Sequence, residues 1–211
     1  EAGSNDGTFL KEIKRISKAK VLGVDPSKNI SKLAQKKNIK TMIDYFDLRT
    51  SKKIQKIYGK ADVIYGANVF NHVDNNLNFL DGINFLLKEN GILVLEVPDL
   101  NSLVKKIGFD TIYHEHRHYY SARSLNKILN KKCFKIIKLE KIKYMAGSIR
   151  VFARKSKNNF KIKKKLSYIN LNEFINFKKK IKKIIKEIKF FENQNLKNNN
   201  FVYGIGAATK G

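Results

Sequence analysis

The sequence predicts an α/β fold in which helices cover a mostly parallel sheet. Short apolar runs, each about as long as a buried strand, alternate with segments whose apolar residues recur every three or four positions. This alternation is typical of parallel strands that are joined by crossover helices. At 211 residues the chain is long enough to bury a full hydrophobic core, and length alone predicts one or two domains.

The first half of the chain carries the alternation most clearly. Strands are predicted over residues 21–24, 39–43, 61–67 and 92–97, and helices at 8–16, after Pro26-Ser27, near 51–57 and over 78–87. Proline followed by serine is typical of a helix start. Asn90-Gly91 is expected to turn the chain into the strand at 92–97, which Pro98 then ends.

The second half predicts a helix at 124–130 and two strands at 134–139 and 148–153. Because the connection between these strands is too short for a parallel crossover, they should be antiparallel. The sheet is therefore expected to end in an antiparallel strand.

A separate amphipathic helix is predicted over residues 161–192. It rests on Phe174, Phe177, Ile181, Ile184, Ile188 and Phe191, which recur at spacings of three and four. We expect it to pack against a domain; a coiled-coil partner or a membrane-surface role is the alternative. The expected division is a main domain at 1–155, a helical linker at 156–200, and the first strand and glycine turn of a further domain at 201–211.

The net charge of +26 comes almost entirely from lysine, since 6 of the 44 basic residues are arginine. The lysines are scattered along the whole chain, and Asn and Ile, which share AT-rich codons with Lys, are also abundant. Base composition explains this charge better than a nucleic-acid or membrane partner, so neither partner is predicted.

The single Cys133 excludes an internal disulfide and a cysteine-rich zinc site in this chain. No apolar run is long enough to span a bilayer, and a cytoplasmic location is expected.

A glycine loop opens the chain. Gly3 and Gly7 follow Glu1-Ala2, which is interpreted as the end of a strand, and Asp25 ends the next strand about 20 residues later. This arrangement is the one that binds a ribose at a helix N-terminus. Asn5 replaces the middle glycine of the dinucleotide pattern, and Glu1 would repel a pyrophosphate. S-adenosylmethionine, which carries a ribose and positive charges, fits these residues better, with a purely structural turn as the alternative.

Three of the 4 histidines lie close together at His114, His116 and His118, and the fourth is His72. Histidine gains and loses a proton near neutral pH, and here it stands beside Glu115 and Tyr113, so the run indicates proton transfer. The alternatives are a polar loop without a catalytic role and a metal site made by the three histidines on one face of a strand.

The chain resembles the sugar C-methyltransferases that act on nucleotide-linked 4-keto-deoxysugars, within the class I S-adenosylmethionine-dependent superfamily. The Asp-Thr-Ile-Tyr-His-Glu-His run is the most specific match; the others are residues 1–10, 23–27, 68–73, 96–98, 146–151 and 203–211. The resemblance implies a Rossmann-like class I methyltransferase sandwich with S-adenosylmethionine as cofactor and a nucleotide sugar as substrate.

The same resemblance implies roles for individual residues. His116 would be the base that removes a proton next to the ketone, Glu115 would orient it or bind substrate, and Tyr113 and His72 would contact the sugar. The cofactor would be held by Glu1, Gly3, Asn5, Gly7, Asp25 and Asn68.

Three departures from the family pattern stand out. The four-cysteine zinc module is absent, only the first strand of the C-terminal domain is present, and Ala146-Gly147 replaces a tandem glycine. We therefore expect this chain to be a fragment.

Two other functions stay open: an O- or N-methyltransferase of another small molecule or of RNA, and a non-catalytic basic binding domain on the same scaffold.

Overall fold

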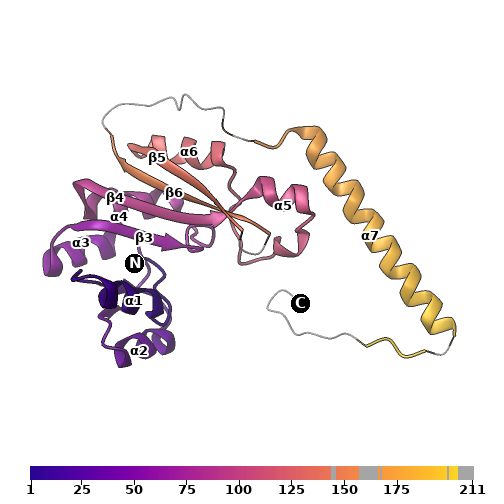
Figure 1. Cartoon of the computed structure of the whole chain (residues 1–211), viewed down its shortest axis with the longest axis horizontal. Coiled ribbons are helices and arrows are strands. Elements are labelled where there is room, and N and C mark those ends of the chain that lie inside the picture. Colours follow the sequence, from indigo (N-terminus) through magenta and orange to yellow (C-terminus); the bar gives the residue numbers. More distant parts are fainter. Residues whose placement is uncertain (144–145, 157–165, 167, 199, 204–211) are drawn as a thin grey trace.

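The computed structural model describes residues 1–143, 146–156, 166, 168–198 and 200–203 of the chain. Figure 1 shows a twisted sheet with helices packed against it, and one long helix, α7, that extends away from this body. The predicted α/β class, the mostly parallel sheet and the long final helix are confirmed. A search of the described residues for a helix able to cross a membrane finds none.

The first residues of the chain join two pieces of sheet. One piece pairs β1 (Gly23–Val24) with β2 (Thr41–Met42), and the other has the order β3 (Ala61–Ala67), β4 (Leu87–Pro98), β6 (Ser148–Lys155), β5 (Phe134–Ile142). The amide of Ala2 donates to the carbonyl of Tyr65 at 2.8 Å, and the amide of Val24 donates to the carbonyl of Glu1 at 2.9 Å. Residues 1–3 therefore lie between β1 and β3 and make the sheet continuous.

The predicted antiparallel strand is confirmed as β6. It runs antiparallel to β4 and to β5, whereas β3 pairs with β4 in parallel. In space β6 lies inside the sheet, between β4 and β5, so β5 forms the edge. The antiparallel strand is thus last in the chain but second from the edge in the sheet.

One face of the sheet is covered by α3 (Leu48–Tyr58), α4 (Asn76–Leu86) and α6 (Ala122–Lys131), which meet alternate residues of the central strands. The buried strand residues are Leu93, Leu95 and Val97 of β4 and Ile149, Val151 and Ala153 of β6. Each fully buried aliphatic side chain contributes about 1.5–3 kcal/mol to the free energy of folding. This core fixes the ends of the strands, where the candidate site lies.

A smaller cluster holds α1 (Thr8–Ile16) against α2 (Lys28–Lys36) through Leu10, Ala34 and Ile39. Gly7 is required at this contact, because a Cβ there would lie 2.9 Å from the Cβ of Ala34, and its φ of +72° favours glycine. The turn that enters α1 is therefore fixed by packing as well as by its backbone conformation.

Two sequence-based expectations were wrong in detail. Strand β4 already begins at Leu87, so Asn90-Gly91 lies within the strand, opposite an irregularity in its pairing with β3, and does not form a turn before it. A Cβ on Gly91 would lie 2.7 Å from the side chain of Leu87, so the glycine allows a close approach at this irregularity.

Helix α7 spans Leu171–Lys197, whereas the sequence predicted a helix over 161–192; the described residues 166 and 168–170 are not helical. Asn170 starts it with a capping box, in which Asn170 and Glu173 accept hydrogen bonds from each other's amides. Phe177 packs against Leu103 and Val104 of α5 (Leu100–Lys106), so the helix contacts the domain near its N-terminus. Residues 157–165 and 167 and the expected glycine turn at 204–211 lie outside the described residues, and 201–203 form no helix or strand.

Candidate active site

The site lies at the carboxyl ends of the parallel strands. Asp25 follows β1, Asn68 follows β3, and Asp99 follows β4, while residues 1–3 lead directly into the glycine loop. Ligands of open α/β sheets bind at this edge. Residues that are far apart in the sequence are therefore brought to one side of the molecule.

The glycine loop has an unusual backbone. Gly3, Asn5 and Gly7 have φ angles of 69°, 49° and 72°, in the left-handed region that favours glycine and tolerates asparagine. A Cβ on Gly3 would lie 3.0 Å from the side chain of Val69, so a larger residue would push the loop away from β3. The loop thus presents bare backbone at the edge of the sheet, directly before α1.

Asp25 ties this loop to the neighbouring strand. Its Oδ2 accepts a hydrogen bond from the amide of Asn5 at 2.9 Å, and its Oδ1 accepts one from the amide of Ser27 at 2.9 Å. Each carboxylate oxygen can accept a further hydrogen bond, and two hydroxyls of a ribose are suitable donors. Sequence spacing predicted that Asp25 and the loop would meet, and they do.

Glu1 lies beside them with an incomplete set of partners. Burial raises the pKa of its carboxyl to about 7. Its Oε2 atom is buried and has no hydrogen-bond partner among the described residues. A buried acceptor of this kind fits a cationic group, which would both pair with the carboxylate and satisfy the oxygen.

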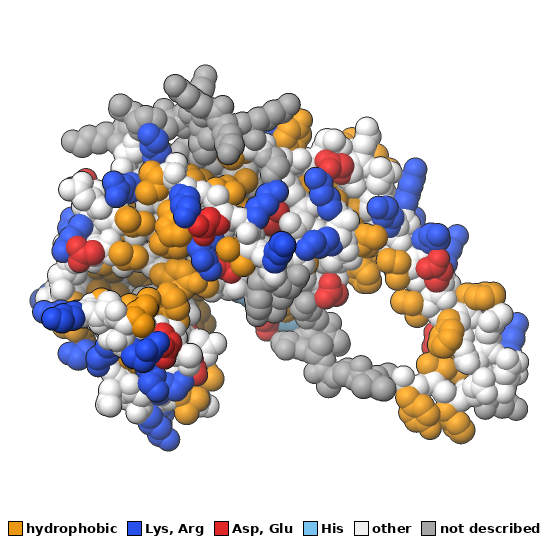
Figure 2. Space-filling model, viewed as in Figure 1, with side chains coloured by type: hydrophobic (Ala, Val, Ile, Leu, Met, Phe, Trp, Pro, Cys, Tyr) orange, Lys and Arg blue, Asp and Glu red, His pale blue; other side chains and the backbone are white. Residues whose placement is uncertain are grey.

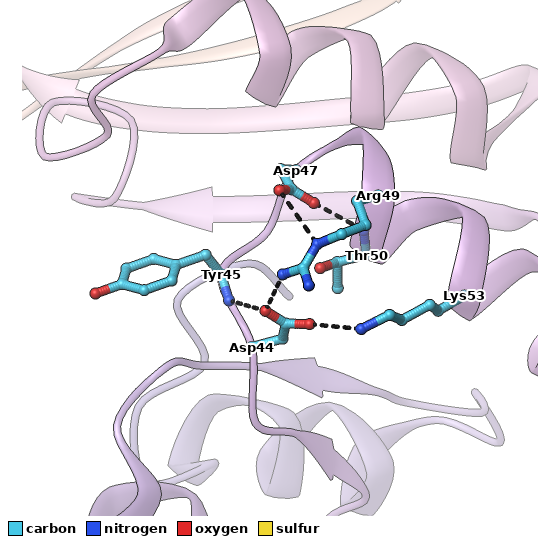
Figure 3. A network of polar contacts seen from close by, with 6 residues as sticks. All are labelled: Asp44, Tyr45, Asp47, Arg49, Thr50 and Lys53. Atoms are coloured by element: carbon cyan, nitrogen blue, oxygen red, sulfur yellow. Dashed lines mark hydrogen bonds and ion pairs between the residues drawn. The ribbon is translucent and has the colours of Figure 1, made fainter.

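Figure 3 shows an acidic residue at the same edge that the sequence analysis did not identify. Asp44 follows β2 and accepts hydrogen bonds from Arg49 at 2.7 Å, from Lys53 at 3.0 Å and from the amide of Tyr45 at 2.9 Å. Burial acts to raise its pKa, but these two basic side chains outweigh it and hold the pKa below its ordinary value. Asp44 therefore anchors the loop after β2 to α3 and leaves Tyr45 exposed at the edge.

A cavity of about 300 Å³ lies next to Asn68. It is lined by Asn68, His72, Asp99, Thr111, Tyr113 and His116, among others, and by residues 146–148. Asn68 takes a φ of 52°, and its amide donates to the carbonyl of Glu96 at 2.8 Å, so it is held at the end of β3. The cavity thus begins where the sheet ends and extends to the histidine-rich segment.

His116 has a defined orientation in this cavity. Its Nδ1 lies 2.9 Å from the carbonyl oxygen of Thr111, which can only accept a hydrogen bond. In the neutral ring Nδ1 therefore carries the hydrogen, and the lone pair is on Nε2. Thr111 is in turn fixed by its hydroxyl, which donates to the carbonyl of Gly108 at 2.6 Å. The sequence analysis quoted Thr111 within the motif and gave it no role; it is the residue that sets the tautomer.

Two further predicted residues surround His116. The ring of Tyr113 lies 4.4 Å from that of His116, centroid to centroid, and the ring of His72 lies 4.8 Å away, edge to face. The Nδ1 atom of His72 is 2.9 Å from the carbonyl oxygen of Glu115, so its hydrogen is also on Nδ1 in the neutral ring. His72, Tyr113 and His116 therefore converge, as expected, on one cavity.

The side chain of Glu115 does not join them. It is exposed and lies outside the cavity, and its contact with His72 runs through its backbone carbonyl. Residues 113–116 form a turn, closed by the amide of His116, which donates to the carbonyl of Tyr113 at 3.0 Å; in this turn His116 lines the cavity and Glu115 does not. The structure thus gives Glu115 a place beside the site without the direct contact to His116 that the sequence analysis expected.

The three clustered histidines do not share one face. Residues 113–119 form an irregular segment after a short 3₁₀ turn, η1 (Phe109–Thr111), and not a strand. His114 is exposed, whereas Nε2 of His118 donates to the carbonyl of Val73 at 3.0 Å. Across the described residues, no three His, Cys, Asp or Glu side chains gather as metal ligands would. The metal site considered from the sequence has no support in this arrangement.

A buried ion pair lies beneath the cavity and was also missed from the sequence. Arg150 of β6 donates from Nε and Nη2 to Oε2 of Glu96 at 2.9 and 2.7 Å, and Glu96 is buried. The hydrogen bond to Glu96 raises the pKa of the Arg150 guanidinium. The pair joins β4 and β6 at the register position Glu96↔Arg150, two residues along each strand from Pro98 and Ser148, which line the cavity.

The basic residues are distributed as the sequence predicted. Figure 2 shows Lys and Arg side chains scattered over the visible face, with acidic and apolar side chains between them.

Comparisons with known proteins identify the family. Residues 1–139 match the family model that is described as a methyltransferase domain. The C-methyltransferase NovU from Streptomyces niveus is 34% identical over 153 residues, which are 72% of this chain and 36% of NovU. The chain therefore spans about a third of the length of this curated relative.

Solved structures show the same fold at low sequence identity. A SAM-dependent methyltransferase from Archaeoglobus fulgidus has a TM-score of 0.60 at 18% identity and covers 73% of this chain and 84% of its own. Magnesium protoporphyrin IX methyltransferase from Synechocystis PCC 6803, crystallised with bound SAH, has a TM-score of 0.55 at 20% identity, with coverages of 74% and 72%. With the glycine loop, Asp25 and the family match to residues 1–139, the chain belongs to the methyltransferase domain family.

Proposed function

We propose that the protein is an S-adenosylmethionine-dependent C-methyltransferase whose substrate is a nucleotide-linked 4-keto-deoxysugar. The observation that carries this proposal is the convergence of His116, His72 and Tyr113 on a cavity that begins at Asn68. Transfer of a methyl group to the carbon next to a ketone needs a base that removes a proton from that carbon, whereas transfer to oxygen or nitrogen needs no such carbon-acid step. The 34% identity to a C-methyltransferase supports the same reaction type.

The methyl donor is S-adenosylmethionine, which supplies an electrophilic methyl group on a positively charged sulfur. Asp25 binds the ribose hydroxyls, and Gly3, together with Asn5 and Gly7, lets the backbone approach the donor. The carboxylate of Glu1 pairs with the positive charge of the amino-acid end, which satisfies its buried Oε2. Asn68 stands between this loop and the cavity, next to the methyl group.

His116 makes the sugar carbon nucleophilic. Its Nε2 lone pair takes the proton from the carbon next to the ketone, the C–H bond breaks, and its electron pair forms the enolate. The carbonyl of Thr111 accepts a hydrogen bond from Nδ1 and stabilises the imidazolium that results. A hydrogen bond from the Tyr113 hydroxyl to the ketone oxygen stabilises the negative charge that develops there, and His72 contacts the sugar from the same cavity.

In the second step, transfer of the methyl group, the protein mainly positions the two reactants and needs no further acid or base. The enolate carbon forms a bond to the methyl carbon as the bond from methyl to sulfur breaks, and the ketone is restored. The cavity walls hold the sugar in line with that bond, which is where most of the acceleration of such a transfer arises. His116 then returns its proton to solvent.

The proposal is tested with a panel of nucleotide 4-ketosugars and S-adenosylmethionine. The full-length protein should convert at least one of them to a product that is one CH₂ heavier, and carbon NMR should place the new methyl on carbon. A methyl on oxygen or nitrogen, or S-adenosylmethionine binding without conversion of any member of the panel, would contradict it. His114→Asn is the matched control, because His114 is exposed and outside the cavity.

A further inference from the structure

A second, larger hollow lies beside the candidate active site. It has a volume of about 650 Å³, and Asp74, Asn76, Leu77, Arg117, His118 and Tyr119 contribute to its wall. We propose that this hollow, called here the nucleotide groove, binds the nucleoside diphosphate part of the substrate. This inference rests on the proposed function and adds to it a second subsite with its own residues. Pockets for small ligands commonly span about 300–1,000 Å³, so the volume suits a nucleotide.

The groove and the active-site cavity are built from the same two segments. The amides of Arg117 and His118 both donate to the carbonyl of Asn71, at 2.9 and 3.1 Å, and hold the two segments together. Within each segment neighbouring residues serve different sites: His116 lines the cavity, and Arg117 lines the groove. Because the cavity and the groove share these two segments, a ligand whose sugar lies in the cavity would place its diphosphate at the groove.

The groove offers donors to an anion. The guanidinium of Arg117 is one, and the amides of Asn76 and Leu77 are two more, because they are in the first turn of α4 and have no acceptor among the described residues. Asn75, which precedes them, caps the amide of Asn78 with its side chain and leaves these two amides unpaired. A helix N-terminus beside an arginine is a favourable environment for phosphate oxygens.

Arg117 is now paired with a carboxylate that a phosphate would replace. Its Nη1 lies 2.6 Å from Oδ1 of Asp74, and both side chains are more than half exposed. Exposed pairs of this kind are weak, so the guanidinium is available to a bound diphosphate. Asp74 itself is a like charge for the ligand and should oppose binding. Removing the negative charge of Asp74 should therefore strengthen nucleotide binding, whereas removing the positive charge of Arg117 should weaken it.

A buried amide distinguishes a nucleotide from a bare phosphate. Asn76 is 7% exposed, and its Oδ1 has no hydrogen-bond partner among the described residues, while its Nδ2 is bonded to the hydroxyl of Tyr120. An unpaired buried acceptor calls for a donor, such as a ribose hydroxyl or a base N–H. Fully ionised phosphate offers none. The groove thus combines donors for an anion with an acceptor for the nucleoside.

The test is calorimetric titration of the protein with thymidine diphosphate and with uridine diphosphate. Arg117→Gln should weaken binding of the preferred nucleotide about tenfold, and Asp74→Asn should tighten it several-fold. Arg15→Gln is the matched control: Arg15 forms an exposed pair with Glu12 at 2.7 Å on α1. It should leave the affinity unchanged.

Three results would overturn the inference. Arg117→Gln could leave the nucleotide affinity unchanged, or Arg117→Gln and Arg15→Gln could lower that affinity equally. The third is that inorganic pyrophosphate binds as tightly as either nucleotide. Titration with S-adenosylhomocysteine in the same variants separates this subsite from the proposed reaction. If the groove is wrong and the methyltransferase proposal right, S-adenosylhomocysteine still binds and ketosugars are still methylated. If no methyl transfer occurs while Arg117→Gln still weakens nucleotide binding, the groove stands and the proposed reaction fails.

Discussion

His72 and His116 meet edge to face across the cavity, with ring centroids 4.8 Å apart, although 43 residues separate His72 from the Glu115 carbonyl that holds its ring. Each ring donates its Nδ1 hydrogen to a backbone carbonyl, so each carries its lone pair on Nε2 in the neutral form. Two rings that are oriented by backbone, and not by each other, form a site that is organised before substrate arrives.

The first prediction concerns His116 as the base. His116→Ala in the full-length protein should abolish exchange of the proton next to the ketone and reduce methyl transfer by about 10² to 10⁴, the usual loss for a positioned base. Affinity for S-adenosylhomocysteine should stay the same, because the ring contacts the sugar side of the site. Proton exchange in deuterated water, followed by NMR, measures the step directly.

The matched control for this variant is His114→Ala, which removes an exposed ring next to the same segment. It should leave both exchange and methyl transfer unchanged. Exchange at the wild-type rate in His116→Ala would assign the base to another residue, with Tyr113 the next to test.

Local patterns in the sequence predicted most of the fold, because the spacing of apolar residues within a strand or helix shows which of its faces is buried. Helix α5 was missed although Leu100, Leu103, Val104 and Ile107 have helical spacing and Asp99 caps it. That signal is short and follows directly on a strand. The irregular segment at 113–119 was not predictable in this way, because the carbonyl of Asn71 holds it from more than 40 residues away.

Residue types identified the candidate site better than they identified its geometry. The alternation of strands and helices predicts parallel strands that lie side by side. Asp25 and the glycine loop meet because both follow such strands at the same edge of the sheet. The exposure of Glu115 and the role of the Thr111 carbonyl depend on side-chain direction and on backbone contacts, which residue types do not encode. The same limit hid the pair of Arg150 and Glu96, which depends on the register between β4 and β6.

The second prediction concerns Asp25. Asp25→Ala should weaken S-adenosylhomocysteine about 10- to 100-fold, because two ribose hydroxyls lose a charged acceptor. Asp62→Ala, which removes an exposed carboxylate paired with Lys88, is the control and should have no effect. Calorimetry measures both, and unchanged affinity in Asp25→Ala would remove this residue from the cofactor site.

The third prediction concerns the ion pair beneath the cavity. Arg150→Met should lower the free energy of unfolding by about 2–4 kcal/mol, because it leaves the carboxylate of Glu96 buried without a partner. Arg154→Met, on the same strand but exposed, should change it by less than about 0.5 kcal/mol. Urea denaturation measures both. Adding Glu96→Gln to Arg150→Met should recover part of the loss, and equal effects of the two arginine variants would contradict the assignment.

The last prediction follows from the pKa of Glu1, which burial raises to about 7 and which the nearby carboxylates of Asp25 and Asp6 also act to raise. A folded-state pKa above the unfolded value of about 4.5 means that the protonated carboxyl favours the fold. Its contribution to stability is complete below pH 4.5 and is lost as the pH rises through about 7. Glu1→Gln should therefore remove this part of the pH dependence of unfolding.

Binding of a cation should show the opposite sign, because it needs the ionised carboxylate. Between pH 5.5 and 7 the ionised fraction of a group with a pKa of about 7 rises roughly sixteenfold, so affinity for S-adenosylmethionine should rise by up to that factor. Glu1→Gln should bind it weakly at both pH values and with little pH dependence. Calorimetry at the two pH values measures the ratio, and an unchanged ratio in the variant would mean that another group, and not Glu1, meets the charge of the ligand.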